Sequence, residues 1–178
     1  MNRKVSELGW PEEALLGTAA LSAPAPRKRP LGDRVAMENR WIKVIVADDN
    51  SATLDAVTKF LRGEEYSVIS MVGDGLALVR DALEKEADIA VVDMIMPGMN
   101  GIEATARLRD KGCSIRVVLL TAHREPEFVT AALAAGAYGF VLKHRLVLDL
   151  PKAIDAALDG QTFLSPSLEN LPSSLRSR

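Results

Sequence analysis

One short stretch of this sequence, an apolar run that ends on a carboxylate, constrains the fold more than any other. Residues 89–92 are all apolar, three of them are β-branched, and Asp93 follows them directly. A run that does not alternate is typical of a central strand in a parallel sheet, because helices cover both of its faces. Asn100, with Glu103 three residues later, then predicts a capped helix. The stretch therefore predicts a buried strand, an acidic tip, a turn and a helix, in that order.

Three further apolar runs also end on polar side chains. Residues 43–47 lead into Asp48 and Asp49, residues 117–120 into Thr121, and residues 139–142 into Lys143. Amphipathic helical patterns separate the runs, so the strands are expected to be parallel and joined by right-handed crossovers. The carboxyl ends of parallel strands lie along one edge of a sheet, where ligands bind. We therefore expect three carboxylates, a hydroxyl and an ammonium group to converge at this edge.

The crowding of carboxylates at this edge predicts a cation. Taken singly, Asp93 or the pair Asp48 and Asp49 could be no more than helix caps or solvated turn residues. Three carboxylates that lie close together repel one another, and a divalent cation or a lysine is needed to neutralise them. Mg²⁺ prefers such oxygen ligands. The pattern therefore predicts a Mg²⁺ site with Lys143 beside it.

This set of residues resembles the receiver domain of two-component response regulators. The residues that carry the resemblance are Asp48, Asp49, Asp93, Thr121 and Lys143, with Pro97, Gly101 and Phe140 in support. Residues 93–101, 136–143 and 160–166 are most similar to the NarL/FixJ subfamily, also called LuxR-type. The resemblance covers roughly residues 42–164 and implies a flavodoxin-like α/β fold, a doubly wound five-stranded parallel sheet with strand order 2-1-3-4-5. One departure is His144, which stands where many receivers have proline, so no cis peptide is expected after Lys143.

The resemblance also implies a phosphoryl acceptor and its metal. Asp93 would take a phosphoryl group from a histidine kinase or a phosphotransfer protein. Asp49 and Asp93 would bind Mg²⁺ directly through their carboxylates, and Asp48 would act directly or through water. The backbone carbonyl of Ile95 would add another oxygen. Such a chain is not an enzyme in the usual sense, because it catalyses only its own phosphorylation and dephosphorylation.

Further roles follow from the same resemblance. Lys143 and Thr121 would contact the phosphoryl oxygens, and Phe140 would turn inward as Thr121 moves. Ile95 and His123 would border the route of the attacking water and tune the lifetime of the phosphoryl group. Phe140 could equally be a fixed core aromatic, and His123 an ordinary loop histidine.

Phosphorylation is then expected to switch protein–protein interaction. The expected surface consists of the helix predicted over residues 126–135, the strand over 139–142 and the helix after it. It would bind a downstream protein or a second copy of the chain. A helix-turn-helix needs on the order of 60 more residues after Leu164, so direct DNA binding by this chain is not expected.

Two alternatives stay open beside this reading of the sequence. The chain could be a pseudo-receiver that binds partners without phosphorylation, or a receiver fragment of a DNA-binding transcriptional regulator. Other phosphate chemistries fit less well. A haloacid-dehalogenase-like phosphatase would need an Asp-x-Asp motif after the first strand, and Asp48 and Asp49 would repel the phosphate of FMN.

Composition divides the chain into three segments. Residues 1–40 are rich in proline and charge and are predicted to be a flexible leader, residues 41–164 the receiver domain, and residues 165–178 a flexible tail. The net charge of −2 gives no electrostatic reason to bind nucleic acid or an anionic membrane. No apolar run approaches the roughly 20 residues of a membrane span, and the lone Cys113 excludes an internal disulfide. These features predict a cytoplasmic protein.

Apolar spacing predicts the buried faces of two helices. Leu76, Val79 and Leu83 recur at helical spacing after a Gly-Asp-Gly turn and are predicted to face the core. In the last helix, Leu150 is expected to open the apolar face. Pro151 would then lie in the first turn, where proline is tolerated.

Overall fold

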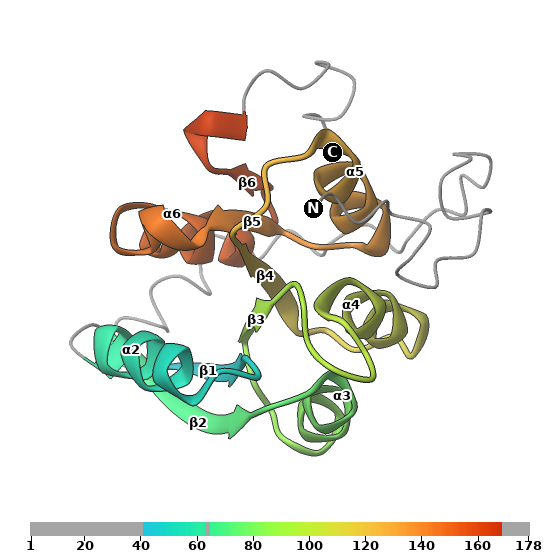
Figure 1. Ribbon diagram of the computed structural model, residues 1–178. Helices are drawn as coiled ribbons and strands as arrows, with labels where there is room; N and C mark the ends of the chain where they lie inside the picture. The colour runs from blue at the N-terminus through green and yellow to red at the C-terminus, as the bar shows by residue number, and fades with distance from the viewer. Residues whose placement is uncertain (1–40, 63–64, 169–178) are drawn as a thin grey trace.

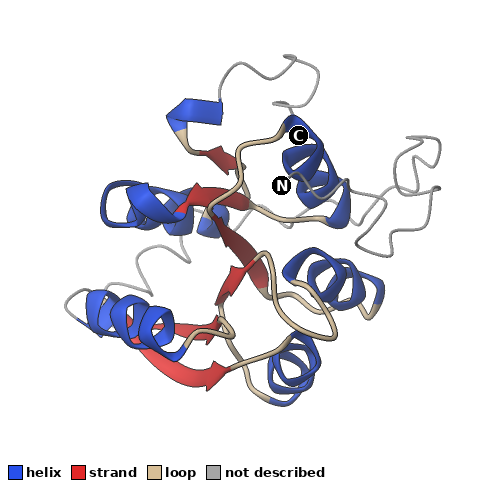
Figure 2. Ribbon diagram, viewed as in Figure 1, coloured by secondary structure: helices blue, strands red, loops and turns tan. Residues whose placement is uncertain are grey.

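The structure is a computed structural model that describes residues 41–62 and 65–168. Within them the chain forms one sheet of six parallel strands in the order β2-β1-β3-β4-β5-β6 (Figures 1 and 2). The strands are β1 (Ile42–Ala47), β2 (Tyr66–Val72), β3 (Ile89–Asp93), β4 (Arg116–Thr121), β5 (Gly139–Leu142) and β6 (Phe163–Leu164). The predicted doubly wound α/β fold with a parallel sheet is confirmed.

The sixth strand corrects the predicted count of five. Phe163 pairs with Gly139 and Leu164 with Phe140, both in parallel register with β5. A strand of two residues is too short to display a hydrophobic period, so the sequence pattern could not reveal it. Its consequence is that β5 has a hydrogen-bonded neighbour on both sides.

Helices cover both faces of the sheet. In the described part of the chain, α2 (Ser51–Arg62) and α6 (Leu146–Leu158) pack on one face, and α3 (Gly75–Glu84), α4 (Gly101–Asp110) and α5 (Pro126–Ala135) pack on the other (Figure 1). All five residues of β3 are buried, as its uninterrupted apolar run predicts. None of the helices described here has both the length and the apolar character that crossing a membrane requires.

Local signals in the sequence set the start of α4 and the end of α5. Asn100 accepts hydrogen bonds from the backbone N–H groups of Ile102 and Glu103, and the Glu103 carboxylate accepts the N–H of Asn100. This is the predicted capping box. At the end of α5, Gly136 adopts the left-handed conformation with φ of 103°, which a residue with a side chain rarely adopts.

The predicted buried face of α3 is wrong for two of its three residues. Leu76 is 58% exposed and Leu83 is 48% exposed, whereas Leu78 and Val79 face the core. Two overlapping apolar patterns run along this helix, and spacing alone does not choose between them. In the structure, the side of α3 that contains Gly75 faces inward. A side chain at Gly75 would collide with the backbone carbonyl of Met99.

The C-terminal part also differs from the prediction. Helix α6 begins at Leu146, after a 3-10 turn over Lys143–Arg145, so Pro151 lies inside the helix and not in its first turn. The Lys143–His144 peptide is trans, as expected. Ser165 and Leu168, which follow the short strand β6, are both buried. The predicted leader, residues 1–40, and the end of the predicted tail, residues 169–178, lie outside the described residues.

Candidate functional site

The carboxyl ends of four neighbouring strands bring the predicted residues together. Asp48 follows β1, Asp93 and Thr121 end β3 and β4, and Lys143 follows β5. The register pairs Asp93 with Leu120, the residue before Thr121, and pairs Thr121 with Leu142. These residues therefore lie along one edge of the sheet, because parallel strands bring together carboxyl ends that are far apart in the sequence.

Three carboxylates form the acidic part of the site. Asp48, Asp49 and Asp93 each offer an oxygen that lies within 4.8 Å of the other two. Asp48 and Asp93 are buried at 1% and 7% exposure, and Asp49 is exposed to solvent. Carboxylates that share so small a space suit a hard divalent cation, and the exposed side leaves room for the water ligands that Mg²⁺ retains. The donor set therefore fits the predicted Mg²⁺.

Lys143 bridges two of the three carboxylates. Its Nζ lies 2.9 Å from Asp48 Oδ2 and 3.0 Å from Asp93 Oδ1. Burial raises the pKa of Asp93 above its ordinary value, and the charge of Asp48 adds to this, although Lys143 opposes both. For Lys143, burial alone would lower the pKa, but the hydrogen bonds to Asp48 and Asp93 outweigh it and the pKa is raised. Lys143 is therefore a cation at neutral pH.

Backbone contacts hold the carboxylates in place. The N–H of Asn50 donates to Asp48 Oδ1 at 2.9 Å, so both oxygens of Asp48 are engaged. Behind Asp93, a side chain at Gly101 would collide with the backbone carbonyl of Asp93, so only glycine lets α4 start so close to β3. The sequence pattern did not predict this contact of Asn50 with Asp48. An aspartate that binds the N–H two residues later forms a common turn, which is the signal that could have found it.

The residues expected to switch or tune the site lie around it. The Thr121 hydroxyl is buried and accepts the N–H of His123 at 2.9 Å. Nδ1 of His123 lies 3.5 Å from Oε2 of Glu125. The centroids of the His123 and Phe128 rings are 5.2 Å apart. Ile95 is 42% exposed, whereas Phe140 is completely buried in the hydrophobic core. Their proposed functions stay predictions.

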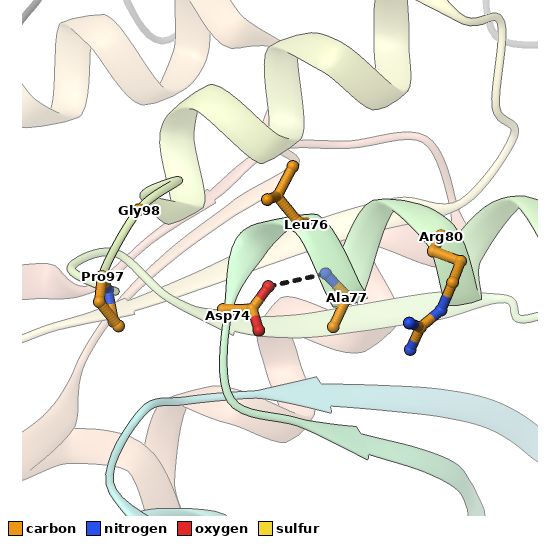
Figure 3. A pocket seen from close by; sticks show the side chains of 6 residues that line it. All are labelled: Asp74, Leu76, Ala77, Arg80, Pro97 and Gly98. Carbon is orange, nitrogen blue, oxygen red and sulfur yellow. Dashed lines mark hydrogen bonds between the residues drawn. The ribbon is translucent and has the colours of Figure 1, made fainter.

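A separate hollow lies between the start of α3 and the loop after β3 (Figure 3). It is lined by Asp74, Leu76, Ala77, Arg80, Pro97 and Gly98. Its two charged side chains already have partners, since Asp74 caps α3 by accepting the N–H of Ala77 at 2.8 Å and Arg80 pairs with Asp81. The chemistry of this face therefore belongs to the acidic site and not to the hollow.

Known proteins resemble the chain over the region that carries this site. A family profile described as the response regulator receiver domain matches residues 44–155. The chain is 31% identical over 128 residues to response regulator GacA of Pseudomonas syringae pv. syringae, which covers 71% of this chain and 60% of GacA. It is 33% identical over 128 residues to the probable transcriptional regulatory protein NarL of Mycobacterium tuberculosis, covering 71% and 59%. The chain thus spans only about 60% of the length of these curated relatives.

Solved structures match the same region. The signal receiver domain of NarL from Mycobacterium tuberculosis superposes with a TM-score of 0.60 at 32% identity, covering 67% of this chain and 94% of that one. The isolated receiver domain of RcsB from Salmonella enterica serovar Typhimurium, solved with the phosphomimetic BeF₃⁻, gives a TM-score of 0.66 at 29% identity. That match covers 78% of this chain and all of the RcsB domain.

Proposed function

This chain belongs to the family of response regulator receiver domains and is homologous to NarL/LuxR-type regulators, and on that basis we propose that Asp93 accepts a phosphoryl group from a histidine kinase or a phosphotransfer protein. One observation carries the proposal. The carboxylates of Asp48, Asp49 and Asp93 converge within 4.8 Å, and Lys143 bridges two of them. A cluster of this kind concentrates negative charge at a single buried nucleophile with a cation held beside it.

In the proposed transfer, a carboxylate oxygen of Asp93 attacks the phosphorus of a phosphohistidine. The new O–P bond forms as the P–N bond breaks. The leaving ring nitrogen keeps the electron pair, and the other ring nitrogen carries the proton, so that neutral imidazole leaves. Lys143 holds Asp93 through Oδ1 before the transfer and can pair with a phosphoryl oxygen after it. The Thr121 oxygen already accepts the His123 N–H, so its own O–H is available for a second phosphoryl oxygen.

We propose Mg²⁺ as the cofactor, held by the carboxylates of Asp48, Asp49 and Asp93 and by the backbone carbonyl of Ile95. When bound, it supplies positive charge that neutralises the phosphoryl oxygens. The burial of Asp48 and Asp93 supports this assignment, since Lys143 alone brings one positive charge to three carboxylates.

The proposed output is a change in protein–protein interaction. Thr121 would move toward the phosphoryl group, and Phe140, which pairs with Leu119 in the register and is completely buried, would repack beside it. The faces of α5, β5 and α6 would then favour a downstream partner or a second copy, as a shift between populations already present. We propose that the chain meets its histidine kinase in the cytoplasm. RcsB, a relative of known structure, has been solved bound to DNA, and DNA binding by a longer form of this protein is a second candidate output.

The contacts support a receiver unit that runs from residue 41 to at least Leu168. Ser165 donates its N–H to the carbonyl of Phe140 at 3.0 Å, and Leu168 is 4% exposed. We therefore propose a C-terminal limit for this unit later than residue 164.

Acetyl phosphate with Mg²⁺ tests the proposal directly. The chain should gain the mass of one phosphoryl group, and the gain should be labile to hydroxylamine. Asp93→Asn should gain none, whereas Asp110→Asn, a control at an exposed helix end, should behave as the wild type. Full incorporation by Asp93→Asn would refute the assignment, and no incorporation by the wild type would favour the pseudo-receiver.

A further inference from the structure

The segment after α6 returns to the strand end that carries Lys143. Because β6 pairs with β5, Ser165 comes to lie beside the last residues of β5 and is completely buried there. Three residues on, Leu168 packs in the same hydrophobic cluster as Phe140. Both residues are thereby held against β5, the strand that leads into the acidic site.

A buried carboxylate, Asp149, joins this segment to both flanks of Lys143. The Ser165 hydroxyl donates to Asp149 Oδ2 at 2.7 Å and accepts the N–H of Leu142, the residue before Lys143, at 3.1 Å. Arg145, two residues after Lys143, donates from Nε to Asp149 Oδ2 at 2.7 Å and from Nη2 to Oδ1 at 3.2 Å. The residues on both sides of Lys143 are therefore tied to one carboxylate.

Asp149 is suited to hold these groups firmly. It has no exposed surface. Burial alone would raise its pKa, but the hydrogen bonds from Arg145 and Ser165 outweigh burial, so the pKa lies below its ordinary value. Hydrogen bonds to a charged acceptor are stronger than neutral ones, and a buried charge is costly to leave unpaired. The cluster therefore resists displacement of any one member.

We propose that Asp149 and Ser165 are positioning residues that hold Lys143 at the acidic site. Lys143 reaches Asp48 and Asp93 at 2.9 and 3.0 Å at the same time, so a small movement of its backbone would take Nζ out of reach of one of them. This inference rests on the proposed function, because Lys143 is there assigned to a phosphoryl oxygen. It links the placement of Lys143 to the packing of the segment that carries Ser165 and Leu168.

The chain contains a matched control at the opposite edge of the sheet. There the hydroxyl of Ser70, on β2, donates to Oδ2 of the buried Asp81 at 2.5 Å, and Lys85 Nζ lies 2.7 Å from the same oxygen. Ser70→Ala removes a hydroxyl from a buried carboxylate just as Ser165→Ala does. It leaves the neighbourhood of Lys143 unchanged.

The test compares two affinities in the full chain. Beryllofluoride in saturating Mg²⁺ probes the phosphoryl site, and Mg²⁺ alone probes the carboxylates, both by calorimetry. Ser165→Ala should bind beryllofluoride about tenfold more weakly, as loss of a supporting hydrogen bond usually costs. Its Mg²⁺ affinity should not fall, because Lys143 donates no metal ligand and its displacement takes a positive charge away from Asp48 and Asp93. Ser70→Ala should change neither affinity. In a Lys143→Ala background, Ser165→Ala should have no further effect.

Several outcomes would overturn the inference. They are an unchanged beryllofluoride affinity in Ser165→Ala, an equal loss in Ser70→Ala, or a loss that persists without Lys143. If Ser165→Ala does not fold, Arg145→Gln replaces it, with a smaller loss expected in the same direction. Failure of the proposed function would look different, since the wild type itself would not bind beryllofluoride. In that case the rate at which an amine-reactive reagent labels Lys143 tests whether Ser165 positions this lysine. The rate should rise in Ser165→Ala and not in Ser70→Ala.

Discussion

Two buried carboxylates at opposite edges of the sheet use nearly the same chemistry. Asp81 on α3 and Asp149 on α6 each accept a serine hydroxyl from the strand region at their edge of the sheet. Each also pairs with a cation four residues away along the chain, Lys85 for Asp81 and Arg145 for Asp149. The two clusters differ in the backbone they hold.

The Asp81 cluster joins one helix to the edge strand β2, and its cations lie at the surface, with Lys85 40% and Arg80 62% exposed. The Asp149 cluster encloses Lys143 in sequence, because Leu142 and Arg145 are both its members. We infer from this difference that the Asp81 cluster only stabilises the fold, whereas the Asp149 cluster also orders the reactive site.

The largest expected difference lies between the lysines of the two regions. Lys143→Ala removes the ammonium that bridges Asp48 and Asp93, so phosphoryl incorporation from acetyl phosphate should slow by roughly 100-fold, as for loss of one charge-stabilising donor. Lys85→Ala should leave the rate unchanged. The rate of mass gain at fixed Mg²⁺ concentration measures phosphorylation of both variants. A similar loss of rate in Lys85→Ala would show that the two lysines do not differ in function.

The second difference concerns stability. Asp149→Ala deprives the buried Ser165 hydroxyl and Arg145 of their acceptor, and should cost about 3 kcal/mol of unfolding free energy. Asp81→Ala should cost only about 1 kcal/mol, because Lys85 and Arg80 regain water. Urea unfolding followed by circular dichroism, with equal m-values as the control, measures both. A larger loss from Asp81→Ala would reverse the ranking.

The third measurement uses acid. The hydrogen bonds from Lys85 and Ser70 lower the pKa of Asp81 from 3.8 to about 2. A lowered pKa means that the folded state favours the carboxylate, so this stabilisation is complete above the unfolded value and is lost as pH falls from about 4 toward 2. Asp81→Asn should flatten the fall of stability in that window by about 1 kcal/mol, since water screens the exposed cations. Parallel pH curves for wild type and variant would contradict it.

The smallest expected difference is in salt dependence. Raising NaCl from low to molar concentration should reduce the contribution of the Asp81 cluster to the unfolding free energy by about 0.5 kcal/mol, because its cations are exposed. Arg145 is 29% exposed and Asp149 is buried, so that cluster should respond less. Comparing Lys85→Gln and Arg145→Gln with the wild type at both salt concentrations measures the contrast. Equal salt responses would show that exposure does not distinguish the two regions.

Much of the candidate site could be predicted because its residues stand at strand ends. Asp48, Asp93, Thr121 and Lys143 each follow or end an apolar run, and parallel strands bring such ends together whatever fills the loops. Tertiary contacts are harder to predict. The bond of Ser165 to Asp149 joins residues sixteen apart through a strand of only two residues, which has no pattern to detect.

Local patterns in the sequence were enough to predict the alternation of strands and helices along the chain, the capping box at Asn100 and the polar residues at the strand ends. Each of these features depends on neighbours within a few positions along the chain. Three other features follow from the tertiary structure. They are the side of α3 that faces inward, the sixth strand formed by Phe163 and Leu164, and the hydrogen bonds that link Asp149 to Arg145 directly and to Leu142 through Ser165. These features depend on close contacts between distant segments, such as Gly75 against Met99, and apolar spacing carries no information about which partner a face will meet.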